Sequence, residues 1–104
     1  SLFLHVKKPA VLVTRKRLIT IRGEASPGAL VSVNGIMVNA DEHGNFRANV
    51  PLKEGSNRII VAAVDVGGQR KAAELPKVVL DTRPPTSKST TTWQKPGSTK
   101  VKWQ

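Results

Sequence analysis

The chain has 104 residues, with 17 Lys or Arg against 7 Asp or Glu, and a formal net charge of +10. It contains no Cys, which excludes disulfides, thiolate nucleophiles and Cys-ligated zinc. Its length fits one small domain, and no stretch approaches the roughly 20 apolar residues of a membrane-spanning helix. The net charge suggests nucleic-acid binding, and its distribution along the chain decides how much weight that suggestion carries.

The positive charge lies at the two ends of the chain. Residues 1–23 carry six basic side chains and no acidic one, whereas residues 24–81 carry six basic against seven acidic side chains. Residues 82–104 carry five basic side chains and again no acidic one. The middle of the chain is therefore close to neutral, and the question of anion binding concerns the two ends.

The N-terminal part predicts three short strands. Alternating apolar residues over 2–6 indicate the first, in which Leu2, Leu4 and Val6 point inward. Pro9 breaks this run, which resumes over 11–14. Residues 17–23 form a further strand with both isoleucines on one face.

Asn34-Gly35 is the strongest local signal, because this dipeptide favours a two-residue type I′ turn between two strands. It lies between apolar runs at 29–33 and 36–40. The turn predicts that all six members of three cross-strand pairs share one face, namely Val33 with Ile36, Val31 with Val38, and Ala29 with Ala40.

The second half of the chain continues the strand pattern. After a turn at 41–45, a strand points Phe46, Ala48 and Val50 inward. Residues 58–66 are apolar on both faces, which is typical of a central strand. Residues 70–80 return from a Gly-Gly turn, and Pro76 within them indicates an edge strand, a bulge or a switch between sheets.

This pattern predicts about seven short antiparallel strands in residues 1–82, which fit an all-β two-sheet sandwich entered at one pole and left at the other. Residues 83–104 are basic and rich in Pro, Ser and Thr, so we expect a flexible tail or linker there. The alternation of Val101 and Trp103 leaves open that a further module begins at this end.

Turn residues and strand spacings between residues 23 and 85 agree with one family pattern. The matching segments are Arg22-Gly23-Glu24, Pro27-Gly28, Asn34-Gly35, Asp41-Glu42-His43-Gly44-Asn45-Phe46, Val50-Pro51-Leu52, Glu54-Gly55-Ser56-Asn57, Gly67-Gly68 and Asp81-Thr82-Arg83-Pro84-Pro85. This part of the chain resembles bacterial immunoglobulin-like domains, most closely the glucodextranase B-domain-like family.

The resemblance implies an immunoglobulin-like antiparallel β-sandwich of about seven strands. Such modules serve as spacers, as partners of catalytic domains or as adhesion repeats, often in tandem, in exported bacterial proteins. The resemblance therefore implies an extracytoplasmic setting (periplasm, cell surface or medium) and neighbouring domains of a larger chain as partners. It supplies no catalytic residues.

Signals for catalysis or metal binding are weak. No local spacing links His5 or His43 to a Ser and an acid. The segment 41–45 surrounds a glycine with oxygen ligands, but it lacks the roughly 12-residue length and terminal Glu of an EF-hand loop, so a hairpin turn is favoured. Asp65 is expected to accept hydrogen bonds from the turn that follows it. We expect neither a cofactor nor enzyme activity.

The basic residues near the N-terminus are the best functional signal. A possible anion-binding patch comprises Lys7, Lys8, Arg15, Lys16, Arg17 and Arg22. A solvated face is the alternative, and lysines on edge strands also block aggregation. The aromatic residues before the tail are Phe3 and Phe46, too few for base stacking or sugar stacking, so we expect no specific nucleic acid and disfavour a carbohydrate-binding module.

The sequence thus predicts a non-catalytic spacer or binding module of a larger exported bacterial protein, monomeric in isolation. Protein or anionic-polymer ligands are compatible with it. The alternative is an electrostatic binder of anionic polymers or membrane surfaces that uses the basic N-terminal strands and the tail.

Overall fold

The computed structural model describes residues 1–85, which form eight strands and no helix. The strands are β1 (Leu4–Val6), β2 (Val13–Thr14), β3 (Leu18–Ala25), β4 (Leu30–Val33), β5 (Ile36–Asn39), β6 (Asn45–Pro51), β7 (Gly55–Val64) and β8 (Arg70–Leu80). Among the described residues, no helix is long and apolar enough to cross a membrane.

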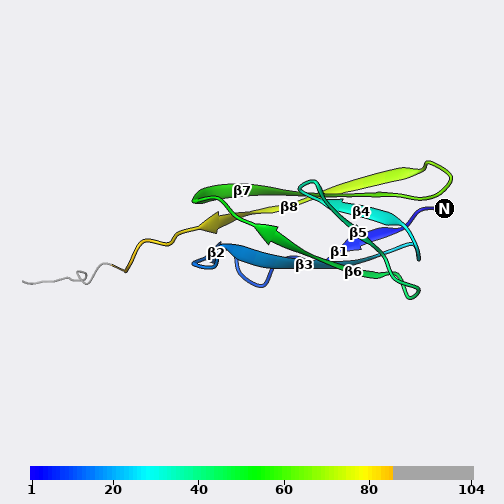
Figure 1. Cartoon of the computed structure of the whole chain (residues 1–104). Coiled ribbons are helices and arrows are strands. Elements are labelled where there is room, and N and C mark those ends of the chain that lie inside the picture. The colour runs from blue at the N-terminus through cyan, green and yellow to red at the C-terminus, as the bar shows by residue number, and fades with distance from the viewer. Residues whose placement is uncertain (86–104) are drawn as a thin grey trace, which may run out of the picture.

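The strands form two sheets that pack face to face (Figure 1). One sheet has three strands in the order β1-β3-β6, and the other has five in the order β2-β8-β7-β4-β5. The prediction of an all-β two-sheet sandwich is confirmed. β7 lies inside the larger sheet, between β8 and β4, as its two apolar faces predicted.

One strand pair departs from the antiparallel prediction. β2 runs parallel to β8, with Val13 opposite Val79, and the Val79 N–H donates to the Leu12 carbonyl oxygen at 2.8 Å. The chain does not reverse its direction between β1, which pairs with β3, and β2, which pairs with β8. It therefore reaches the second sheet running parallel to β8. The expectation of antiparallel strands throughout is therefore wrong at β2.

The hairpin of β4 and β5 is confirmed in turn and register. Asn34 and Gly35 have φ values of 49° and 85°, as a type I′ turn requires. Val33 lies opposite Ile36 and Val31 opposite Val38. The Asn34 side chain also joins the turn to β7, because its Oδ1 accepts from the Ile60 N–H at 2.8 Å.

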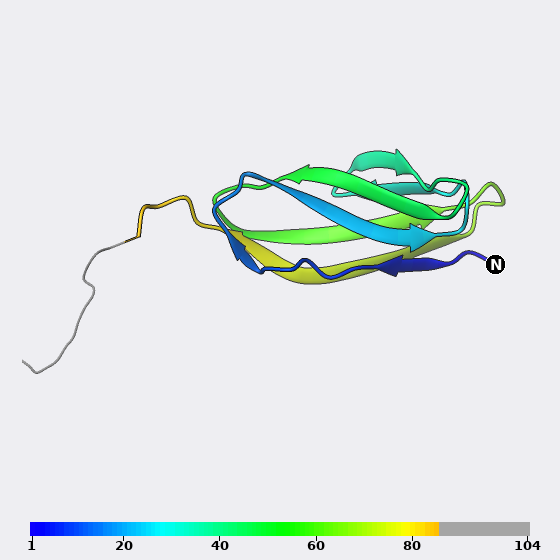
Figure 2. The same cartoon turned by 90° about the horizontal axis from the view of Figure 1, so that it is seen from below.

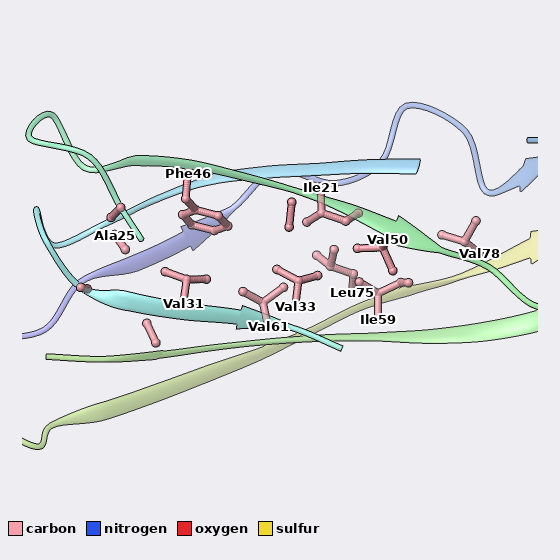
Figure 3. Packing of buried hydrophobic residues seen from close by; sticks show 14 of the residues in the cluster. Ile21, Ala25, Val31, Val33, Phe46, Val50, Ile59, Val61, Leu75 and Val78 are labelled. Atoms are coloured by element: carbon pink, nitrogen blue, oxygen red, sulfur yellow. The ribbon is translucent and has the colours of Figure 1, made fainter. Parts of the chain in front are cut away.

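The core fills the space between the sheets (Figure 3). Phe46, Ala48 and Val50 of β6 are buried, as the alternation predicted, and Figure 3 shows Phe46 opposite Val31 of β4 and Val50 opposite Ile59 of β7. Full burial of such a side chain stabilises the fold by about 1.5–3 kcal/mol. Among residues 1–85 every fully buried side chain is apolar, so the polar residues are left to the surface.

Pro76 causes a β-bulge. β8 lies between β2 and β7, but β2 pairs only with Val79 and Leu80, so among the described strands the side of β8 away from β7 is an open edge at Pro76. Ile59 pairs with Leu75 but Asn57 pairs with Val78, so β8 has one extra residue at this point. Pro76 has no N–H to donate to a ladder, and the bulge removes it from the pairing.

The two ends of the described chain lie at opposite poles of the sandwich, as predicted (Figures 1 and 2). Leu2 donates its N–H to Gln69 Oε1 at 2.9 Å, so the N-terminus lies beside the β7–β8 turn. Residues 81–85 leave the other pole after β8. Most of the tail predicted over 83–104, including both tryptophans, lies outside the described residues.

Gly23 gives a test of this packing. A Cβ at Gly23 would lie 2.5 Å from the His5 carbonyl oxygen and 2.5 Å from Phe46 Cζ. We therefore expect Gly23→Ala to lower the free energy of unfolding by about 2 kcal/mol, because backbone of β1 and a core ring would both have to shift. Urea denaturation measures the change.

The control is Gly67→Ala, because a Cβ there would meet its nearest atom, Asp65 Oδ1, at 3.4 Å. Its free energy of unfolding should change by less than about 0.5 kcal/mol. Equal stability of the two variants would contradict the tight approach of β1 and Phe46 to Gly23.

Candidate functional site

The six predicted patch residues are all exposed, but the structure divides them into two groups. Lys7, Lys8 and Arg22 lie at the three-stranded sheet, whereas residues 15–17 form the connection from β2 to β3. Arg22 lies five positions after Arg17 along extended chain, which corresponds to about 17 Å. This distance exceeds the Debye length of about 8 Å at physiological salt, so the groups act separately on a small anion.

Lys7 and Arg22 of the first group belong to a row of cations across the outer face of the small sheet. The Lys7 N–H donates to the Arg22 carbonyl oxygen at 2.9 Å, which places these residues opposite each other. Arg22 is in turn opposite Arg47 of β6. We call Lys7, Arg22 and Arg47 the cationic row. Like charges directly opposite on neighbouring strands destabilise a sheet, so the row has an electrostatic cost that an anion would relieve.

Arg47 belongs to this row although the sequence did not single it out. The predicted inward positions of Phe46 and Ala48 already placed Arg47 on the outer face. Its neighbour could not be predicted, because β3 and β6 pair across more than 20 intervening residues. The alternation in β6 is the signal that could have found Arg47.

A depression of about 280 Å³ accompanies the row. Its lining includes the three cations together with Asp41 and Asn45. Asp41 Oδ1 is occupied within its turn, accepting from the His43 N–H at 2.9 Å and the Asn45 N–H at 2.8 Å. Within residues 1–85 no ion pair within 4.0 Å involves the cationic row. The surface is therefore positive, with a carboxylate at its border.

The second group faces carboxylates at the pole from which the chain leaves. Hydrogen bonds from Arg83 lower the pKa of Asp81 to about 2, and the Arg15 charge contributes to the shift. Hydrogen bonds from Thr82 lower the pKa of Glu54, with a smaller contribution from Arg17. Arg15 and Arg17 thus have carboxylates in their surroundings, although neither forms an ion pair within 4.0 Å in residues 1–85.

The histidines and the acidic turn form no further centre in the described part of the chain. His43 is exposed in its hairpin turn, and His5 is exposed opposite Glu24. Residues 1–85 contain no group of three His, Cys, Asp or Glu side chains that could hold a metal ion. Asp65 closes its strand as predicted, because its Oδ1 accepts from the Gln69 N–H at 2.9 Å.

Comparison with known proteins does not identify the chain. It matches no protein-family model, and a search of curated proteins finds no match. The resemblance to the glucodextranase B-domain-like family therefore stays a prediction.

The ion pair between Asp81 and Arg83 predicts a lowered pKa for the Asp81 carboxyl group. The Asp81 carboxylate accepts from Arg83 Nε and Nη2, each at 2.9 Å. We expect NMR to find an Asp81 pKa of about 2, and Arg83→Gln to raise it toward 3.8. Because the pKa of the folded state lies below that of the unfolded state, the stabilisation is present above pH 3.8 and is lost as pH falls toward 2.

Lys53→Gln is the control for this titration, because Lys53 is exposed and is not among the groups that shift the Asp81 pKa. It should leave that pKa unchanged. An Asp81 pKa near 3.8 in the unaltered protein would contradict the pair.

Proposed function

We propose that the chain is an immunoglobulin-like, non-catalytic spacer or binding module of a larger exported bacterial protein of the cell envelope or the medium. Its partners are then the neighbouring domains of that protein, and its location is extracytoplasmic. The sequence resemblance, the order of the strands and the positions of the two chain ends support this proposal.

The strand order supports the immunoglobulin-like part of the proposal. In immunoglobulin sandwiches the first, second, fourth and fifth strands share one sheet, and the third, sixth and seventh share the other. If β1 and β2 are counted as one strand split by Pro9, β1-β3-β6 corresponds to the first, second and fifth strands and β8-β7-β4 to the second set, while the fourth strand has no counterpart in residues 1–85. β5 then corresponds to the added strand of variable-type domains.

The positions of the chain ends carry the spacer function. The N-terminus lies at one pole and Pro85 leaves the other (Figure 1). β8 alone has 11 residues, which span about 36 Å. Domains attached before and after the sandwich would therefore be held apart by its length, because paired strands resist compression.

Energy transfer between two dyes tests the spacer function. The chain has no cysteine, so Ser1→Cys with Pro85→Cys allows both labels to be attached specifically. We expect one narrow distance distribution centred on the order of 40 Å, because the strands fix the separation of the poles. Single-molecule measurement of the labelled full chain reports it.

The control pair is Ser1→Cys with Val66→Cys, because Val66 is exposed in the turn beside the N-terminus. Transfer should be much more efficient in this pair. A Ser1–Pro85 pair that transfers equally well, or whose distances spread broadly, would rule out a rigid spacer.

Binding of an anionic polymer is the second candidate function, and the cationic row favours it. Its three cations lie on adjacent strands about 4.8 Å apart, a spacing suited to a chain with repeated anionic groups. The heparin affinity of the full chain should fall steeply between about 20 and 150 mM salt, because bound counterions are released.

We expect Arg22→Gln with Arg47→Gln to weaken heparin binding about tenfold and to make its salt dependence shallower. Arg70→Gln with Lys71→Gln removes the same charge from β8 of the other sheet and is the matched control. Fluorescence titration compares the two. Equal losses would indicate unspecific attraction, and no affinity at about 20 mM salt would exclude this function.

A further inference from the structure

β3 has an unpaired backbone edge over the first part of its length. β1 covers this edge only from Gly23 to Ala25, and one further bond joins the Lys7 N–H to the Arg22 carbonyl oxygen. Pro9 then turns the chain toward the other sheet, where it reaches β8. Along Leu18–Ile21 no other described strand lies on the side of β3 opposite β6.

The open edge presents the backbone groups of two residues. In an antiparallel strand the N–H and C=O of one residue point to the same side, and successive residues alternate. The Arg22 carbonyl points toward β1, so the groups of Thr20 and Leu18 point in the same direction. Within residues 1–85 these groups have no ladder partner, and a further strand could pair with them.

An apolar groove runs along this edge. A cavity of about 630 Å³ is lined by Leu18, Ile19 and Thr20 of β3 and by the crossing segment 9–16. It is continued by a second hollow of about 240 Å³ that shares Pro9, Ala10 and Thr20 with it. Figure 2 shows the crossing segment running from β1 to β2. The larger cavity lies within the range of ligand sites, roughly 300–1,000 Å³.

Several exposed apolar side chains cluster in the groove. Val11, Val13 and Leu18 line it and are 56%, 63% and 53% exposed. Clustered apolar exposure of this kind is typical of interaction sites, whereas single exposed apolar residues are common on any surface.

Cations lie at both ends of the groove. Lys7, Lys8 and Arg22 line its continuation, and Arg15 and Lys16 line the other end. Five of the six predicted patch residues therefore border one groove, although they form no continuous charged surface. An occupant with an apolar middle and acidic ends fits this arrangement.

We propose that the groove binds an extended acidic peptide segment of a partner protein, which adds a strand to β3 beside β1. The peptide backbone pairs with Thr20 and Leu18, its apolar side chains cover Val11 and Val13, and its carboxylates meet the cations at the ends. Strand addition at an open edge is a general mode of peptide recognition. The inference goes beyond the spacer function and does not depend on it.

NMR titration of the full chain with the blocked peptide Glu-Val-Thr-Val-Thr-Val-Glu tests the proposal. We expect the largest shifts at the amides of Leu18 and Thr20. Two N-methylated isomers, at the Val or at the Thr amides, are the matched ligands, because alternate amides of a strand face its partner. One isomer should bind about tenfold more weakly while the other is unchanged. Loss of neither would overturn the proposal.

Thr20→Pro removes one donor from the open edge and should weaken peptide binding about tenfold. Asn49→Pro is the matched control, because it lies opposite Thr20 on β6 and each variant removes the same Thr20 Oγ1–Asn49 Oδ1 hydrogen bond. The control should keep its affinity. Equal losses in two folded variants would overturn strand addition at β3.

Arg15→Glu with Lys16→Glu changes only the connection between β2 and β3, so this variant tests the proposal even if the proline variants unfold. It should weaken the acidic peptide about tenfold and favour a peptide with Lys in place of Glu. Unchanged affinity would overturn the proposal. So would shifts at Leu18 and Thr20 that appear on raising the protein concentration alone, since these would assign the edge to a second copy of the chain.

Discussion

The loss of one backbone donor at Pro9 determines much of this sandwich. β1 pairs with β3 up to Lys7, and the chain then leaves the small sheet because Pro9 has no N–H to continue a ladder. The crossing segment reaches β8 in the same direction, which produces the parallel pair. The same crossing extends the large sheet by one strand and, among the described strands, leaves half of β3 without a neighbour on the side opposite β6. The parallel pair and the groove therefore have a single cause.

The separation of core and surface leaves the charged residues free for other roles. Val50, Ile59 and Val78 come from three different strands and are buried together, and the buried side chains of residues 1–85 are all apolar. A fold that depends on apolar burial tolerates changes of surface charge, which usually alter stability by less than about 0.5 kcal/mol. The positions of Lys7, Arg22 and Arg47 are set by the strand ladder, while their chemistry is not needed for packing.

Local signals in the sequence were reliable, and long-range pairings were beyond them. Asn34-Gly35 determined a hairpin register because the turn type fixes which residues face each other. Pro76 indicated an edge strand, a bulge or a switch between sheets, and which of these occurs depends on long-range pairings, namely how far β2 extends along β8 and where the register with β7 shifts. The position of Arg47 beside Arg22 could not be predicted, because the two residues are distant in sequence. The groove at Leu18 could not be predicted either, because it exists only where the pairing of β1 with β3 ends after Lys7.

The net charge of +10 describes the whole chain, whereas the structure gives the charge of residues 1–22 a geometry. For a small anion the two basic groups are independent, because about 17 Å of strand separates them and salt screens each from the other. An extended peptide differs, since five to six residues span that distance at about 3.3 Å each. It can therefore extend from Arg22 at one end of the groove toward the cations at the other end while its backbone pairs with the β3 edge between them. The spacing that makes the patch weak for a single anion thus suits a ligand that is itself a strand.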